Sequence, residues 1–151
     1  MNFVEIYADG SCKKNPGPGG YGAILFFTDK KGERHKKEIS EGYALTTNNR
    51  MELLGVISAL KILKIPCDVK IYSDSTYVVN GASVWAHNWR KNNFIKRGKP
   101  VPNADLWRAL LELTALHSVT FVWVKGHTDN IYNIRADELA SEAAKNAAKK
   151  D

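Results

Sequence analysis

The sequence predicts an α/β fold in which a mixed β-sheet is covered by helices on both faces. Two observations lead to this prediction. The first part of the chain reads as three strand segments joined by turns, which is typical of an antiparallel meander. The remainder alternates strand and helix segments, which is typical of parallel strands joined by right-handed crossovers. The predicted sheet therefore has five strands, three antiparallel and then two that run parallel to the first.

The opening meander is indicated by alternation and by turn residues. Residues 3–8 alternate apolar and polar side chains, which predicts a half-buried strand. The Gly- and Pro-rich residues 15–20 predict a turn before a second strand over residues 21–28. The polar residues 29–33 then predict a hairpin into a third strand that ends near Tyr43.

The later elements are marked by caps, by a proline and by composition. Thr47 or Asn48 is a suitable N-cap for a helix from about Asn49 to Lys64, which Pro66 ends. The remaining predicted elements, in chain order, are a strand over 69–73, a helix from Thr76, a helix over 105–116, a strand over 119–124 and an Ala-rich helix over 133–149.

Length and composition are those of one soluble domain over residues 1–151. Of the residues, 44% are hydrophobic and 25% are charged, and no apolar run approaches the roughly 20 residues of a membrane helix. The N-terminus lacks the pattern of a signal peptide, so we expect a cytoplasmic protein with no membrane partner. Two cysteines make no disulfide framework. The net charge of +6 favours a polyanionic partner.

Four acidic residues stand in places that are unusual for surface charges. Asp9 is placed at the end of the first strand and Asp74 directly after the strand over 69–73, so both are expected at the same sheet edge. Glu52 lies on the apolar stripe of its helix and is expected to point toward the core, where an unpaired carboxylate is costly. Asp137 lies in the first turns of the last helix.

Two interpretations of these carboxylates remain open at this point. Any one of them could cap a helix or pair with Arg50 or Arg135. Together they would form an oxygen-rich site for hard divalent cations, because such a cluster repels itself unless metal neutralises it. Such sites typically carry out phosphoryl transfer with two metal ions.

The motifs around these residues resemble those of the type 1 ribonucleases H, in their free-standing bacterial form. The matching segments, in chain order, are Asp9-Gly10-Ser11, residues 15–22, residues 47–53, Ser73-Asp74-Ser75, residues 124–127 and residues 135–140. The resemblance implies an RNase H-like fold and a monomeric endonuclease that cleaves the RNA strand of RNA–DNA hybrids. It implies two Mg²⁺ ions, which Mn²⁺ can replace, and products with 5′-phosphate and 3′-hydroxyl ends.

The same resemblance assigns the catalytic residues. It implies that Asp9, Glu52, Asp74 and Asp137 are the metal-binding carboxylates. His127 corresponds to a loop histidine that assists proton transfer or product release, and the alternative is an ordinary surface histidine.

The resemblance also implies substrate contacts. Asn15, Asn48 and Asn49 correspond to residues that contact the minor groove of the hybrid, where 2′-hydroxyls distinguish RNA from DNA. Thr47 and Asn103 correspond to a pocket for a phosphate of the DNA strand. Turn and cap chemistry is the alternative role for these polar residues, and both roles can hold together.

Residues 85–99 form a basic segment without acidic residues. It resembles the basic protrusion with which free-standing relatives hold the DNA strand, and the alternative is a solvated charged face. The substrate-binding candidates within it are Trp85, Trp89, Arg90, Lys91, Lys96 and Arg97. The sequence leaves open whether the aromatic residues, with Phe94, contact DNA or only pack the segment.

The alternatives to a nuclease are a hybrid-binding module that has lost catalysis, another enzyme of the same fold, and a domain of a reverse transcriptase. The four intact carboxylates favour catalysis. Residues 15–20 and 46–53, together with the basic segment, favour the ribonuclease over integrases and resolvases.

Overall fold

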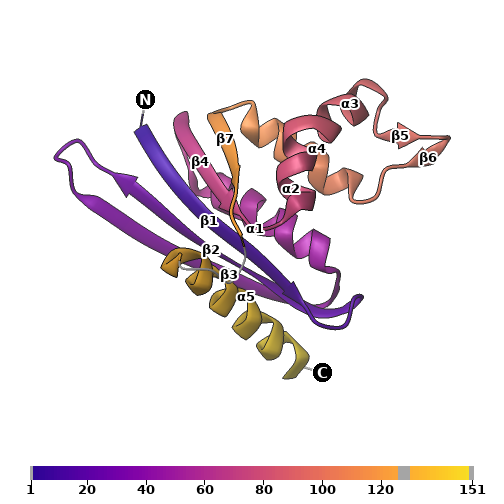
Figure 1. Cartoon of the computed structure of the whole chain (residues 1–151), viewed down its shortest axis with the longest axis horizontal. Helices are drawn as coiled ribbons and strands as arrows, with labels where there is room; N and C mark the ends of the chain where they lie inside the picture. Colours follow the sequence, from indigo (N-terminus) through magenta and orange to yellow (C-terminus); the bar gives the residue numbers. More distant parts are fainter. Residues whose placement is uncertain (1, 126–129, 150–151) are drawn as a thin grey trace.

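The computed structural model describes residues 2–125 and 130–149 of the chain, and its centre is a five-stranded mixed sheet (Figure 1). The strands are β1 (Asn2–Cys12), β2 (Gly17–Thr28), β3 (Arg34–Thr46), β4 (Cys67–Ser73) and β7 (Ser118–Trp123). Their order across the sheet is β3-β2-β1-β4-β7. The first three strands pair antiparallel, whereas β4 pairs parallel with both β1 and β7. The predicted sheet is thus confirmed.

Helices cover both faces of the sheet, as predicted. Figure 1 shows α5 against one face, with α1 and α4 on the opposite side. The helical elements are α1 (Asn48–Ile62), α2 (Thr76–Asn80), the π-helical turn η1 (Gly81–Trp85), α3 (Ala86–Lys91), α4 (Ala104–Thr114) and α5 (Ile131–Lys149). A small hairpin of β5 (Ile95–Lys96) and β6 (Lys99–Pro100) projects beyond α3. None of the helices in the described part of the chain is long and apolar enough to cross a membrane.

The first two strands are longer than predicted, and glycines explain the difference. The predicted turn over residues 15–20 is mostly part of β2, which begins at Gly17. A Cβ atom added to Gly20 would lie 2.7 Å from the Cβ of Ala143 on α5. Gly20 therefore lets α5 approach the sheet closely, and it does not mark the end of a strand.

The helix predicted from Thr76 is divided into α2, η1 and α3. Gly81 lies directly beneath the Trp107 ring, and a Cβ atom there would collide with it. The widened π-helical turn begins at this glycine, where the indole packs. The indole itself is completely buried.

The helix caps follow local sequence chemistry. Of the two candidates for the N-cap of α1, Thr47 fills the position, and its Oγ1 accepts a hydrogen bond of 3.3 Å from the Arg50 amide. Helix α1 ends at Ile62, two residues earlier than predicted. Leu63 is already extended, and the residue before Pro66 is biased away from helical conformation.

The core lies between the sheet and helices α1 and α4. Alternate residues of β1 and β4 point into it and meet the apolar stripe of α1, as in Ile6, Ile71 and Leu53, which are all fully buried. This packing fixes α1 across the end of β1, which is where the predicted carboxylates lie.

Candidate metal centre

Three of the predicted carboxylates meet at one end of the sheet. One oxygen from each of Asp9, Glu52 and Asp74 lies within 4.8 Å of the others. Asp9 and Glu52 are 8% and 4% exposed, and Asp74 is half-buried. Asp137, on the second turn of α5, lines the same hollow. The four residues therefore converge from a strand, a helix, a loop and a second helix.

The register of β1 and β4 places two of these residues side by side. The last parallel pair in the ladder is Tyr7 with Tyr72, and Asp9 and Asp74 each follow two residues later. Asp9 does not end its strand, contrary to the prediction, because β1 remains paired with β2 beyond Asp9 and Gly22 as far as Cys12. Asp9 thus lies where β1 parts from β4 but is still held by β2.

A glycine allows Glu52 to reach this point. A Cβ atom on Gly10 would lie 2.6 Å from the backbone nitrogen of Glu52, so only glycine permits α1 to cross β1 this closely. The Gly10 amide donates a hydrogen bond of 2.6 Å to Glu52 Oε1. The second oxygen, Glu52 Oε2, is buried and has no hydrogen-bond partner among the described residues. An orphaned carboxylate oxygen aimed into a carboxylate cluster is a fitting ligand for a hard cation.

The electrostatics of the site agree with binding of a hard cation. Burial raises the pKa of Asp9 to about 7, with Asp74 and Asp137 acting in the same direction and Glu52 and the Gly10 amide opposing it. Burial also raises the pKa of Glu52 well above its ordinary value, and the negative charges of Asp9 and Asp74 add to this. A bound cation would offset the mutual repulsion of these carboxylates.

The arginines that might have paired with these acids have other partners. Arg50 Nη2 lies 2.8 Å from an oxygen of Asp105, and Arg135 Nε lies 2.9 Å from an oxygen of Glu38 on β3. Both arginines are therefore engaged by acids outside the cluster, which leaves metal binding as the better explanation for the convergence.

The predicted minor-groove residues lie beside the carboxylates. Asn48 and Asn49, at the start of α1, are exposed and line the same hollow. Asn15 Oδ1 accepts a hydrogen bond of 2.9 Å from the Asn48 amide, which ties the β1–β2 turn to the helix. Turn and cap chemistry therefore does hold at these positions, as it does at Thr47, and their exposed side chains leave them accessible.

Asn103 belongs to a polar network that the sequence analysis missed. It precedes α4 with a left-handed φ of 61°, and its Nδ2 donates a 3.2 Å hydrogen bond to the Tyr77 hydroxyl. That hydroxyl also accepts a 3.0 Å bond from Trp107 Nε1. Asn103 Oδ1 in turn accepts from Arg50 at 3.2 Å. Tyr77 also lines the hollow. Its position shortly after Asp74 in the sequence was the signal that could have identified it as a site residue.

The loop histidine, His127, lies outside the described residues. Its predicted role is therefore neither supported nor opposed by the geometry.

The basic segment over residues 85–99 contains α3 and the β5–β6 hairpin (Figure 1). The turn of the hairpin consists of Arg97 and Gly98, both at positive φ (53° and 78°), as in the tight turns typical of two-residue hairpins. The four basic candidates are all exposed, namely Arg90, Lys91, Lys96 and Arg97.

The aromatic residues of this segment divide by role. Phe94 is buried, and half-buried Trp89 packs with its ring centroid 5.7 Å from that of Trp107. Trp85 is 41% exposed, with its centroid 6.1 Å from that of Trp89. Phe94 and Trp89 therefore anchor the segment to the core, and Trp85 is the aromatic with most surface free for a ligand.

Solved structures share this architecture. LC9-RNase H1, a type 1 RNase H with the type 2 active-site motif, is 29% identical with a TM-score of 0.89, over 97% of this chain and 74% of that one. LC11-RNase H1, solved in complex with an RNA/DNA hybrid, is 26% identical with a TM-score of 0.64, over 95% of this chain and 98% of that one. Fold and carboxylate cluster together define a metal-dependent nuclease of the RNase H fold.

The sequence comparisons lead to the family. The family model described as RNase H matches residues 1–145. A ribonuclease H of Methylobacillus flagellatus is 53% identical over 142 residues, which cover 93% of this chain and 91% of the relative. The chain therefore belongs to the RNase H family, whose members hydrolyse the RNA strand of RNA–DNA hybrids.

Proposed function

We propose that this chain hydrolyses the RNA strand of RNA–DNA hybrids at the cluster of Asp9, Glu52, Asp74 and Asp137, with two Mg²⁺ ions that Mn²⁺ can replace. The observation that carries the assignment is the buried Glu52 Oε2, which belongs to a group of carboxylates and has no hydrogen-bond partner within residues 2–125 and 130–149. Six-coordinate, oxygen-rich sites suit Mg²⁺ and Mn²⁺.

The chain's own residues would divide the work as follows. Bound divalent ions supply an activated water and neutralise the charge on the leaving oxygen. Glu52 provides a fixed buried oxygen, held by its bond to the Gly10 amide. Asp9 and Asp74 complete the group of three neighbouring carboxylates where β1 and β4 diverge, and Asp137 approaches from α5. His127 is assigned to assisting proton transfer or product release, and cleavage leaves 5′-phosphate and 3′-hydroxyl ends.

Substrate binding is assigned to two groups of residues near the start of α1, beside this cluster. Asn15, Asn48 and Asn49 would contact the minor groove, and Thr47 with Asn103 would contact a phosphate of the DNA strand. The hybrid bound to the structural relative LC11-RNase H1 supports this class of ligand. We also expect a monomeric, cytoplasmic protein, and light scattering of the purified protein tests the first of these predictions.

The decisive experiment labels each strand of an RNA–DNA hybrid, a DNA duplex and an RNA duplex, and incubates each with Mg²⁺ or with chelator. We expect cleavage of the hybrid's RNA strand alone, only with metal. Glu52→Gln keeps the shape of the side chain and removes its charge, and Asp68→Asn, at an exposed site on β4, is the control. Hybrid binding without cleavage by the wild type would contradict catalysis. Glu52→Gln activity above about a tenth of wild type would contradict its ligand role.

The basic segment is assigned to binding and not to chemistry. Replacing Lys91, Lys96 and Arg97 with Gln should raise KM for the hybrid and leave kcat at saturation unchanged. The reason is that contacts with the DNA backbone stabilise the bound substrate and the transition state equally. Each lost phosphate contact should flatten the plot of log K against log salt by about 0.9, the value for duplex DNA. A drop in kcat with KM and salt slope unchanged would place the segment in the catalytic machinery.

A further inference from the structure

A second group of basic residues lies where the β1–β2 turn meets the last turns of α5. Lys13 and Lys14 of the turn and Lys145 of α5 line one depression of about 220 Å³, and we call these three residues the turn–helix patch. All three are exposed, and none forms an ion pair with another described residue. The other described residues that line the depression carry no charge, namely Pro18, Ser141, Ala144 and Ala148. No acid among these lining residues therefore offsets the positive charge.

The β1–β2 turn holds two of these lysines beside the predicted minor-groove residues. Cys12 Sγ donates a hydrogen bond of 3.3 Å to the carbonyl oxygen of Lys14, which fixes the turn from within. Asn15 Oδ1 accepts its bond of 2.9 Å from the Asn48 amide, which fixes the turn against α1. Lys13 and Lys14 thus directly precede a residue that is tied to the rim of the carboxylate hollow. The patch therefore continues the surface that we assign to the hybrid.

Helix α5 places the third lysine at a defined spacing from the metal centre. Lys145 follows Asp137 by eight residues, which corresponds to about 12 Å along the helix axis. Phosphates of one duplex strand are about 3.4 Å apart along the duplex axis, so this spacing corresponds to about three to four phosphates. Lys149 continues the same face of α5 one turn later and is also exposed. The patch is therefore within reach of phosphates a few nucleotides from the cut.

The turn–helix patch and the basic segment over residues 85–99 lie on different sides of the sheet. Figure 1 shows the C-terminal end of α5 on one side and the β5–β6 hairpin on the other. The chain connects each surface to a carboxylate of the metal centre. Asp74 leads into α2 and the basic segment, and Asp137 leads along α5 to the patch. The metal centre therefore lies between two basic surfaces.

We propose that Lys13, Lys14 and Lys145 bind backbone phosphates of the hybrid beyond the minor-groove contacts, so that the duplex is held on both sides of the cut. This inference rests on the proposed function, because it concerns how the same substrate is held. The small uncharged residues of the depression let a nucleic-acid backbone approach closely, and none of them has an aromatic ring or an amide group that could read a base edge. Binding should therefore be independent of base sequence and sensitive to salt.

The size of the depression favours a phosphate backbone over an acidic protein segment. Protein segments are usually held by at least one large side chain that fills a pocket. The turn–helix depression is smaller than typical ligand pockets, which measure about 300–1,000 Å³. Its continuity with Asn15 also connects it to the nucleic-acid surface.

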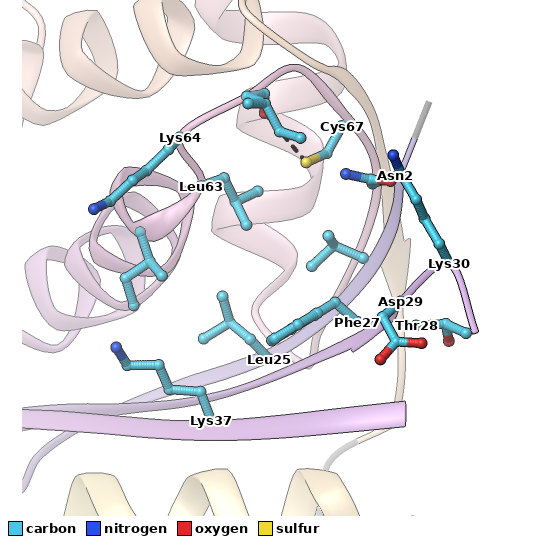
Figure 2. Close-up of a pocket in the computed structure, with 13 residues that line it drawn as sticks. Asn2, Leu25, Phe27, Thr28, Asp29, Lys30, Lys37, Leu63, Lys64 and Cys67 are labelled. Atoms are coloured by element: carbon cyan, nitrogen blue, oxygen red, sulfur yellow. Dashed lines mark hydrogen bonds between the residues drawn. The ribbon is translucent and has the colours of Figure 1, made fainter. Parts of the chain in front are cut away.

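Three lysines at the far end of the sheet provide a matched control. Figure 2 shows Lys37 and Lys64 on one side of an apolar pocket of about 380 Å³ and Lys30 on the other. All three are exposed, and none forms an ion pair with another described residue. Val4, which lines this pocket, is five residues from Asp9 on β1, which corresponds to about 17 Å at the rise of an extended strand. These lysines carry the same charge as the patch but lie away from the surface assigned to the hybrid.

The test compares two triple variants that lose the same charge. Lys13, Lys14 and Lys145 are replaced with Gln in one, and Lys30, Lys37 and Lys64 in the other. Dissociation constants for a fluorescent hybrid are measured by anisotropy across a salt series with Mg²⁺, in the Glu52→Gln background so that the hybrid stays intact. The patch variant should bind at least about fivefold more weakly, and its plot of log K against log salt should be flatter by up to about 2.7, or about 0.9 for each lost contact. The control variant should stay within about twofold of its parent.

Three outcomes would overturn the proposal. Equal weakening by the two variants would show that only the overall charge matters. An unchanged dissociation constant and salt slope in the patch variant would show that its lysines point into solvent. A loss of kcat at saturating hybrid, measured with Glu52 intact, would place the patch in the chemistry and not in binding.

Cross-linking locates the contact and separates this inference from the proposed function. A photoreactive group attached to a Lys145→Cys variant should cross-link to the hybrid, and the same group on a Lys64→Cys variant should not, with the unsubstituted chain as the background. A lack of cross-links from the first variant would refute the contact even if the wild type cleaves hybrids. Cross-links and a patch effect without any cleavage by the wild type would support the binding surface and refute the proposed catalysis.

Discussion

Neutralising Asp9 should stabilise the metal-free protein while abolishing cleavage. The carboxylate lies in a buried cluster of like charges, so its ionisation is unfavourable in the folded state and ordinary in the unfolded chain. Asp9→Asn keeps the shape of the side chain, including an oxygen that can accept the Gly10 amide bond of 2.9 Å, and removes the charge.

The magnitude follows from the raised pKa. With a pKa of about 7 in the folded state and 3.8 as the ordinary value, ionised Asp9 destabilises the fold by about 4 kcal/mol above pH 7. Between these pH values the folded state holds the proton more tightly, so stability falls as pH rises through the window. Burying an amide also has a cost, so we expect Asp9→Asn to gain about 2 kcal/mol, or about 4–8 °C in Tm.

The assay is thermal and urea unfolding in chelator at about pH 3, 5 and 8, of which the lowest and the highest lie outside the titration window between 3.8 and about 7. The advantage of Asp9→Asn should be absent at the lowest pH, where the carboxyl is protonated in both states, and complete at the highest. Added Mg²⁺ should stabilise wild type more than the variant. Asp68→Asn, at an exposed position, is the control. A variant less stable than wild type at the highest pH, or equally favoured at every pH, would refute the electrostatic account.

Three further predictions concern backbone, proton transfer and packing. Gly10→Ala should destabilise the fold by about 1–3 kcal/mol and lower kcat, because the new Cβ would displace Glu52; unchanged unfolding and activity would show that the close approach is not required. His127→Ala should lower kcat at least about tenfold with KM for the hybrid unchanged, and a pure KM effect would contradict a proton-transfer role. Tyr77→Phe should cost about 1–3 kcal/mol in urea unfolding, because the buried Trp107 indole loses its acceptor; a neutral result would mean that water replaces it.

Much of the fold could be predicted because its signals are local. Strand alternation and helix caps place the elements to within a few residues, as at Thr47 and Pro66. The errors arise where a distant residue decides the local structure. Gly20 reads as part of a turn, yet it lies in β2 and packs against α5. Trp107 divides the helix after Thr76, and nothing near Gly81 in the sequence reports that contact.

The convergence of the carboxylates could also be predicted, because it follows from strand topology and helical periodicity. Parallel strands bring Asp9 and Asp74 to one edge, and helical periodicity turns Glu52 inward, so topology alone brings the three carboxylates together. The hydrogen bonds of Asn103 and Tyr77 could not be predicted in this way, because they join residues far apart in sequence through side-chain geometry. The apolar pocket between β1, β2, β3, α1 and β4 was missed for the same reason, because its walls come from five separate elements.

The close contact between α5 and the sheet has a consequence for how the fourth carboxylate could be tuned. Gly20 and Gly22 face the helix without side chains of their own, so β2 packs against main-chain atoms of α5 and the Cβ atoms of Leu139 and Ala143. Asp137 is carried by that helix one turn before Ala140, whose backbone is among the atoms in contact. A single methyl group on β2 would therefore act as a spacer, moving Asp137 relative to Asp9 without changing any charge. The distance between α5 and the sheet therefore helps to set the geometry of the candidate metal centre. Substitutions on β2 that contact none of the carboxylates could change that geometry.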